Sequence, residues 1–236
     1  MRKNRKTAAV LFTALALVFA CGCTKPDEPN NGGGGGNNGN TYNGHEYVDL
    51  GLPSGTLWAT CNVGADTPEG FGDYYAWGET TPKTTYDWSN YKYCNGGEDQ
   101  LIKYCSNEEY GYNGFTDNLT ELQPTDDAAT ANWGNGWCIP TKEQWEEFFA
   151  NTAMSQSMQN GVKVFVFTSS NGKSLFLPVA GEWGNDEIDL SYWANSKDEW
   201  PSYFGNCFYS HYGLSPFINV RYRCHGLSIR PVRSTH

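Results

Sequence analysis

The chain has 236 residues, of which 39 % are hydrophobic, 15 % aromatic and only 18 % charged, a composition that excludes disorder for its main part. The 27 glycines and the lack of long Ala/Leu/Glu/Lys heptads disfavour a helical bundle or coiled coil, so we expect strands and loops. The net charge is −10, and losing the four cations of the N-terminal leader would make it −14. Such an acidic body would repel nucleic acid, which is therefore not expected as a partner.

The first twenty residues have the pattern of an export signal. Four basic residues lie within the first six positions and precede the apolar run 7–20, which is too short to cross a bilayer but suits a secretory signal. Small residues precede Cys21 and Cys23, and this resembles the lipobox cut by lipoprotein signal peptidase. We therefore expect a signal peptide over 1–20 and a lipid on Cys21, with Cys23 as the other candidate; an ordinary secretory signal is the alternative. The chain would then be lipid-anchored at the outer membrane or cell surface of a Gram-negative bacterium.

Residues 21–44 are predicted to form a flexible linker. From residue 24 onward this segment is rich in Gly and Asn, and Tyr42 is its only large apolar side chain, so little offsets the entropy of ordering. The remaining residues, 45–236, have the length of one domain.

Six cysteines remain beyond the lipobox, and an exported protein can join them in disulfides. Cys94 and Cys105 flank a short polar loop and are the disulfide candidate, although every other pairing of the six stays open. No C-x-x-C occurs outside the leader, which disfavours a thioredoxin-like site or a zinc ribbon.

The first predicted element of the domain is a β-hairpin. Residues 47–52 alternate weakly, a Pro-Ser-Gly turn follows, and 56–60 forms the returning strand. The stretches 70–78 and 87–112 are rich in Tyr, Trp, Asn and Gly. We expect them to be long loops held by buried aromatic rings rather than a binding groove.

A helix and a second hairpin are predicted further along. Thr141 and Gln144 form a capping box at the start of a helix that runs to about 149, and three aromatic residues share one face of it. Residues 162–168 are rich in β-branched and aromatic types, an Asn-Gly turn follows, and 174–179 is the partner strand.

Several motifs then occur in a fixed order along the chain. They are VDLGLPSGTLWATCNVGA, GDYYAWGET, YKYC, DDAATANWG, WCIPTKEQW, FLPVAG, YWANS and GLSIRPVR. Together they resemble the Fibrobacter succinogenes major paralogous domain family over about residues 44–233. The resemblance implies an α+β fold, the C-type-lectin-like fold in its formylglycine-generating-enzyme-like variant, loop-rich with antiparallel strands and few helices. It also implies that Gly226, Ser228, Arg230 and Pro231 of the last motif belong to the scaffold.

The enzymes of that fold provide a test for catalysis. The formylglycine-generating oxidases bind copper with two cysteines close together in sequence, whereas Cys207 and Cys224 are much farther apart. Buried or bridged cysteines are therefore the preferred interpretation. The histidines show no spacing typical of a three-His iron site, and G-x-S-x-G is absent. We expect no catalytic residue and no enzyme activity; a copper-dependent oxidase-like enzyme is the alternative.

Calcium is a further metal for which the sequence offers possible ligands. Asp126-Asp127 and Asp186-Glu187-x-Asp189 place carboxylates in predicted loops, and the run that begins at Trp183 loosely resembles the calcium ligands of lectins. Neither group matches an EF-hand loop. We therefore expect solvated carboxylates and predict no metal residue and no cofactor.

The end of the chain lacks five residue types. From Pro201 to His236 there is no Lys, Glu, Gln, Met or Trp, although all five occur before it. A codon that ends in a pyrimidine encodes none of these, whereas asparagine codons mutated at their adenines give Tyr, Ser, His, Phe and most other types found in 208–225. The stretch thus resembles the variable region of diversity-generating retroelement targets, which share the lectin-like fold. The alternative is an ordinary family member whose terminal sheet uses Tyr, Asn and Ser.

This stretch supplies the candidate binding residues. Tyr, His, Phe and Arg give large contact area, and Ser and Asn give adaptable hydrogen bonds, as in antibody loops. The candidates are Trp200, Tyr203, Phe204, Phe208, Tyr209, His211, Tyr212, Phe217, Arg221, Tyr222 and His225. Because strand residues alternate between faces, about half should point inward. We expect this aromatic and polar face to bind a protein or glycan ligand in adhesion or ligand capture; a fimbria-associated structural subunit is a further alternative.

Overall fold

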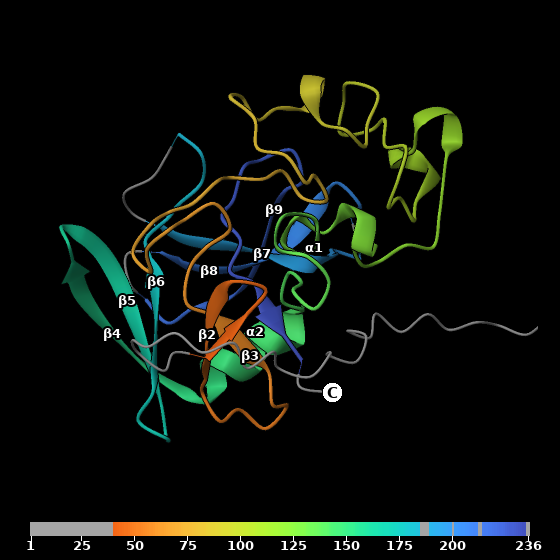
Figure 1. Ribbon diagram of the computed structural model, residues 1–236. Helices are drawn as coiled ribbons and strands as arrows, with labels where there is room; N and C mark the ends of the chain where they lie inside the picture. Colours follow the sequence, from red (N-terminus) through yellow and green to blue (C-terminus); the bar gives the residue numbers. More distant parts are fainter. Residues whose placement is uncertain (1–39, 185–188, 200, 212–213, 235–236) are drawn as a thin grey trace, which may run out of the picture.

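The computed structural model describes residues 40–184, 189–199, 201–211 and 214–234 (Figure 1). The predicted signal peptide, both lipidation candidates and most of the predicted linker lie outside the described residues, as do Trp200, Tyr212, Asp186 and Glu187. The described chain contains three antiparallel sheets, two short α-helices and long irregular loops, which is the predicted loop-rich α+β class.

The first sheet brings the two ends of the domain together. Its strands lie in the order β1 (Asn40–Tyr42), β2 (His45–Asp49), β3 (Leu57–Ala59) and β10 (Val232–Arg233), and each neighbouring pair is antiparallel. β2 and β3 form the predicted opening hairpin. β3 also pairs with β10, so the last strand closes the sheet that the first strands open (Figure 1).

The domain begins earlier than the predicted boundary at residue 45. Asn40–Tyr42 is a strand, and the Tyr42 ring lies 3.7 Å from the guanidinium of Arg233 and 6.2 Å from the ring of Trp137. The Tyr42 hydroxyl also donates to the carbonyl of Asn135. The single aromatic residue of the predicted linker therefore packs on the domain, and the Asn43 side chain adds hydrogen bonds to the carbonyls of Trp133 and Asn135.

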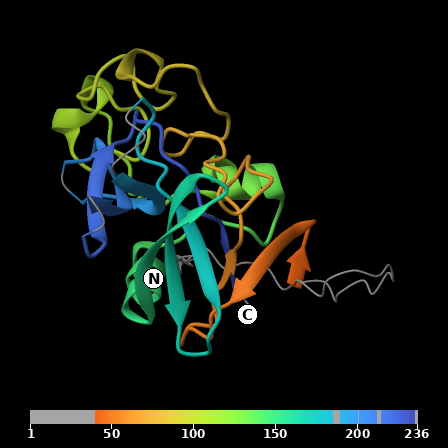
Figure 2. The ribbon, with the colours of Figure 1, turned by 90° about the vertical axis from the view of Figure 1, so that its left-hand side faces the viewer.

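The second sheet is a meander of β4 (Thr152–Gln159), β5 (Val162–Ser169) and β6 (Ser174–Pro178), and it faces the viewer in Figure 2. β5 and β6 confirm the predicted hairpin. β4 was not predicted, although the Asn160-Gly161 turn that joins it to β5 has positive φ at both residues and is a strong hairpin signal.

Helix α2 (Lys142–Ala150) confirms the predicted helix and its cap. The Thr141 side chain accepts from the amide of Gln144, and the Gln144 side chain accepts from the amide of Thr141. Trp145 and Phe148 are fully buried on the inner side of the helix. The third sheet, β7 (Asp189–Lys197), β8 (Phe204–His211) and β9 (Phe217–Tyr222), lies against this helix.

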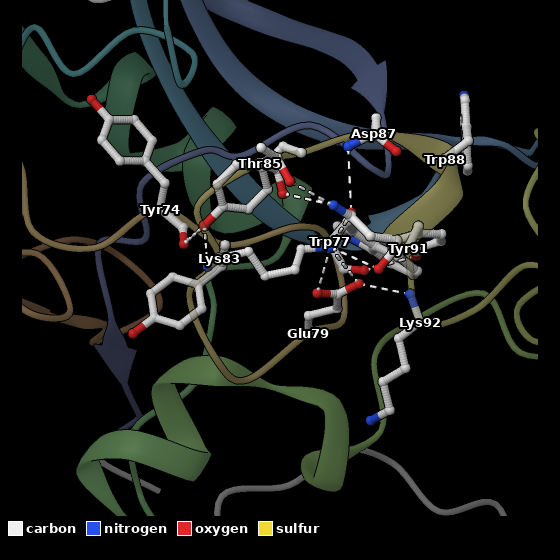
Figure 3. Close-up of polar contacts among 12 residues, drawn as sticks. Tyr74, Trp77, Glu79, Lys83, Thr85, Asp87, Trp88, Tyr91 and Lys92 are labelled. Carbon is white, nitrogen blue, oxygen red and sulfur yellow. Dashed lines mark hydrogen bonds and ion pairs between the residues drawn. The ribbon is translucent and has the colours of Figure 1, made fainter.

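The long loops contain single helical turns and hold many buried rings, as predicted. These turns are η1 (Trp88–Asn90), η2 (Glu108–Tyr110), η3 (Tyr112–Gly114) and η4 (Pro124–Asp126), followed by helix α1 (Ala128–Trp133). The Glu79 carboxylate, 6 % exposed, accepts from the Lys83 ammonium and from the Lys92 amide at 2.7 Å (Figure 3). The same ammonium donates to the Asn90 side chain, so one ion pair fixes both ends of the loop 79–92.

Two clusters of buried side chains form the core. One lies among the loops and includes Trp77, Tyr104 and Trp193, and the other joins α2 to the second and third sheets through Trp145 and Phe167. Within the part of the chain that the structure describes, no helix is long and apolar enough to cross a membrane.

The predicted Cys94–Cys105 disulfide is not present. Both are free thiols: the Cys94 thiol donates to the carbonyl of Trp88 at 3.1 Å, and the Cys105 thiol donates to the carbonyl of Asn107 at 3.1 Å. Each thiol thus bonds to its own end of the loop, and the prediction from loop spacing was wrong.

Candidate binding surface

Phe208 belongs to the core and not to a binding surface, which corrects its place among the candidates. Its ring is 1 % exposed and stacks on the Trp145 ring at 4.4 Å between centroids with 5° between planes. The register of the sheet puts Tyr192, Phe208 and Ile218 in one row across β7, β8 and β9. Side chains of this row therefore face α2.

Side chains from three rows that point to the other face of this sheet form what we call the Tyr209 cluster, consisting of Tyr209, His211, Phe217, Arg221 and Asp189. The Tyr209 hydroxyl donates to Asp189 at 2.9 Å, and His211 Nδ1 lies 2.5 Å from the other oxygen of that carboxylate. The Arg221 guanidinium lies 4.2 Å from the Tyr209 ring centre, and Phe217 meets the same ring edge-on at 5.6 Å.

The Tyr209 cluster is open to solvent but held in position. Phe217 is 52 % exposed and the His211 side chain 47 % exposed, whereas the Arg221 side chain is 21 % exposed. Burial, and then the hydrogen bond to Asp189, raise the pKa of Tyr209. Its phenol therefore stays protonated at neutral pH and remains a hydrogen-bonding group.

A second group of candidates lies at the other end of β8 and β9, and we call it the Tyr222 cluster: Tyr203, Phe204, Tyr222 and His225. The Tyr222 ring lies 4.9 Å from Phe204, 5.8 Å from Tyr203 and 5.2 Å from His225. All four side chains are partly exposed. Trp88 meets the same tyrosine edge-on at 6.0 Å, which connects this cluster to the loop 79–92.

Glu182 links the two clusters. One of its carboxylate oxygens lies 3.7 Å from Arg221 Nε, and the other lies 2.9 Å from His225 Nδ1. Because one carboxylate contacts a member of each cluster, both clusters lie within the span of one macromolecular ligand. We call the two clusters together with Glu182 and Trp183 the C-terminal surface.

Trp183 is the residue of this surface that sequence reasoning missed as a binding group. Its ring is 47 % exposed and meets Tyr74 at 5.7 Å and Tyr86 at 5.8 Å. An exposed indole supported from behind by two tyrosines offers a flat stacking area at low entropic cost. Its position directly after Glu182 was the available signal for a binding role, but the sequence that begins at Trp183 was interpreted only as a possible calcium site.

The two cysteines that would form an oxidase site are buried thiols. Cys207 is 0 % and Cys224 2 % exposed, and burial raises the pKa of each thiol to about 12. Cys207 lies near Arg221 and Glu182, whereas the charged groups near Cys224 are Lys83 and Asp87. At neutral pH both sulfurs are protonated, and a protonated thiol is a poor metal ligand and a poor nucleophile.

The carboxylates considered for calcium accept from donors of the protein itself. Asp126 accepts from Lys103 Nζ and from the Tyr104 hydroxyl, each at 2.5 Å. Asp127 accepts from the amides of Thr130 and Ile139. Within the described residues, no group of three His, Cys, Asp or Glu side chains could hold a metal ion.

The four residues of the last motif, Gly226, Ser228, Arg230 and Pro231, are buried. Arg230 is 0 % exposed, and its guanidinium donates to the Asn62 side chain at 2.9 Å and to the carbonyls of Ala59 and Thr60. Ser228, also fully buried, donates to the carbonyl of Phe71 at 3.0 Å. The terminal motif thus ties the last residues to β3 and to the loop that follows it.

The chain matches no protein-family model, no curated protein and no solved structure.

Proposed function

We propose that this chain is a lipid-anchored surface protein whose C-type-lectin-like domain binds a protein or glycan ligand through the C-terminal surface, without chemistry. The observation that carries the proposal is the surface itself: partly exposed rings, two histidines and an arginine, joined through Asp189 and Glu182. Side chains held by fixed partners lose little entropy when a ligand binds, which favours recognition.

The arrangement of the sheets supports the finer fold assignment within the α+β class. β3 and β10 join the two ends of the domain, and the long loops lie between β3 and α2. The motifs quoted above fall on these same elements: WCIPTKEQW spans the start of α2, and GLSIRPVR ends in β10. A C-type-lectin-like domain of the formylglycine-generating-enzyme-like variant is the fold that unites these features.

The protonated, buried state of Cys207 and Cys224 supports binding over oxidation. A copper site of the formylglycine-generating type needs two thiolates that a substrate and oxygen can reach. Burial works against both requirements, since it raises each pKa to about 12 and leaves the sulfurs out of contact with solvent.

Retroelement diversification is proposed as the origin of the surface. The stretch that lacks Lys, Glu, Gln, Met and Trp includes three residues of the Tyr209 cluster, namely Tyr209, Phe217 and Arg221. The DNA beside the gene tests this origin. A near-copy of the codons for residues 203–225, differing only where the copy has adenine and lying beside a reverse transcriptase gene, is the expected finding; its absence would reject diversification.

An array of glycans and purified cell-surface proteins, probed with the full chain, tests the binding function. We expect saturable binding to specific members, and we expect Tyr209→Ala and Arg221→Ala each to weaken it by roughly tenfold. Ile102→Ala removes an apolar side chain that is 44 % exposed outside this surface and should leave binding unchanged. Equal binding by wild type and both surface variants, or no saturable binding at all, would reject the proposal.

A further inference from the structure

Strand β4 has an unpaired edge without the features that usually protect such edges. It pairs with β5 over all eight residues without a bulge, and the sheet ends there. No backbone hydrogen bond joins β4 to any other described part of the chain beyond β5. In Figure 1 it lies at the outer margin of the ribbon. Its sequence, TAMSQSMQ, contains no charge and no proline, whereas exposed edge strands normally carry one of these to prevent pairing.

The other sheet edges near the core are protected. Along β7, the amides of Asn195 and Lys197 donate to carbonyls of loop residues at 2.9 Å. Along β9, the Asn219 side chain accepts from the Val220 amide and the Arg221 guanidinium donates to the Val220 carbonyl, both at 2.9 Å. The edge strand β6 is short and ends in a proline. β4 is therefore the long uncharged edge among the described strands.

The register with β5 shows which backbone groups point outward. The two-residue turn Asn160-Gly161 closes on the pair Gln159–Val162, and a hairpin of this type closes on a hydrogen-bonded pair. Hydrogen-bonded pairs alternate along the ladder, so the amides and carbonyls of Met154, Gln156 and Met158 face away from β5. These groups are free to pair with another strand.

The sequence of this edge matches itself in the antiparallel direction. Residues 154–158 read Met-Ser-Gln-Ser-Met, a palindrome centred on Gln156. Two copies of β4 that pair with Gln156 opposite Gln156 place Met154 opposite Met158 and Ser155 opposite Ser157. This register makes the three outward-facing residues hydrogen-bonded pairs, as an antiparallel ladder requires.

The side chains also favour this partner. Met154, Gln156 and Met158 lie on the same face as Phe165 and Phe167 of β5, because their pairs are Met154–Phe167 and Gln156–Phe165. Met154 packs against the core, whereas Met158 is 62 % exposed at the far end of the row. In the symmetric pair the exposed Met158 of each copy is covered by Met154 of the other copy.

We propose that a second copy of this chain pairs with β4, forming a two-fold symmetric dimer with a continuous six-stranded sheet. The pairing is isologous, so it closes at two copies and does not grow into a fibre. No residue of β4 belongs to the C-terminal surface, and the pairing does not depend on the nature of the ligand. An extended segment of another protein would use the same edge but would not require the Gln156-centred register.

Sedimentation of the full chain across a wide range of concentration tests the dimer. We expect a monomer–dimer equilibrium in the wild type, and we expect Gln156→Lys and Gln156→Glu each to raise the dissociation constant roughly fivefold or more, because like charges then lie directly opposite. An equimolar mixture of the two variants should recover dimerisation. Gln156 is exposed and its side chain makes no hydrogen bond or ion pair with the described residues, so at concentrations where the wild type is monomeric both variants should keep the wild-type melting temperature.

Asn118→Lys adds the same charge at an exposed loop position and is the matched control. It should dimerise like the wild type. A wild type that stays monomeric, a dimer that Gln156→Lys does not weaken, or a mixture that dimerises no better than either variant alone would overturn the proposal.

Discussion

Phe208 and Phe217 belong to the same aromatic stretch but have opposite environments. Phe208 is 1 % exposed against Trp145, whereas Phe217 is 52 % exposed and touches Tyr209. They occupy adjacent rows of one sheet whose side chains point to opposite faces. Composition therefore marks the stretch as a whole, and for these two phenylalanines the register decides which one is available to a ligand.

The largest expected effect is a loss of stability when a side chain of the row that faces α2 is removed. Phe208→Ala should lower the free energy of unfolding by about 4 kcal/mol, because it removes a stacked ring and leaves a cavity between β8 and α2. Phe217→Ala should lower it by less than about 1 kcal/mol. Urea denaturation of both variants measures the difference, and equal losses would contradict the assignment of the two rows.

Two carboxylates show the same contrast between a buried and a more exposed side chain. The Asp126 side chain is 5 % exposed and accepts from Lys103 and Tyr104, whereas the Asp189 side chain is 19 % exposed, accepts from Tyr209 and contacts His211. Asp126→Asn should cost about 3 kcal/mol of unfolding free energy, because it removes the negative charge beside Lys103 and leaves one acceptor oxygen in place of two. Asp189→Asn should cost less than about 1 kcal/mol. The same denaturation experiment checks both, and a larger loss at Asp189 would reverse the interpretation.

Asp126 should also make the protein sensitive to acid. Burial alone would raise its pKa, but the hydrogen bonds from Lys103 and Tyr104 outweigh burial and lower it. A carboxyl whose folded pKa is lowered contributes stability that is complete above the unfolded value of about 3.9 and is lost as the pH falls through the folded value. Unfolding free energy measured over this pH range should fall less steeply in Asp126→Asn, and an unchanged slope would exclude this origin.

Thiol reactivity provides a smaller test, at the two buried cysteines Cys207 and Cys224. With a pKa of about 12, Cys207 and Cys224 have very little thiolate at neutral pH, so iodoacetamide should label them in the folded protein only at the rate of local opening. Both should react quickly after denaturation. Mass spectrometry measures the labelling. Rapid labelling of both cysteines in the native protein would instead favour the oxidase alternative.

Local signals in the sequence were sufficient for some elements and not for others. The capping box of Thr141 and Gln144 defined α2, because a helix end depends on neighbouring residues. The turn before Val162 held an equally local signal for β4 that was overlooked. The strand at Asn40–Tyr42 also had a local signal, the Asn43-Gly44 turn with positive φ at both residues. Its contacts with Trp137 and Arg233 are distant in sequence, so composition alone predicted a linker there.

The candidate surface was predictable as a set but not residue by residue. Aromatic residues occupy both faces of β8, so hydrophobic alternation could not show which face is inner. That choice depends on Tyr192 pairing with Phe208 and on Trp145 stacking from α2, two long-range contacts. Glu182, which links the clusters, lies before the stretch and outside the compositional signal altogether.

The direct test of the C-terminal surface as the binding site is a measurement of ligand affinity for two variants, Phe217→Ala and Phe208→Leu. The ligand is one array member that the wild type binds. We expect Phe217→Ala to lower affinity about tenfold without changing the unfolding free energy by more than about 1 kcal/mol. Phe208→Leu should leave affinity unchanged while reducing stability. Loss of affinity in Phe208→Leu together with unchanged affinity in Phe217→Ala would contradict the C-terminal surface as the binding site.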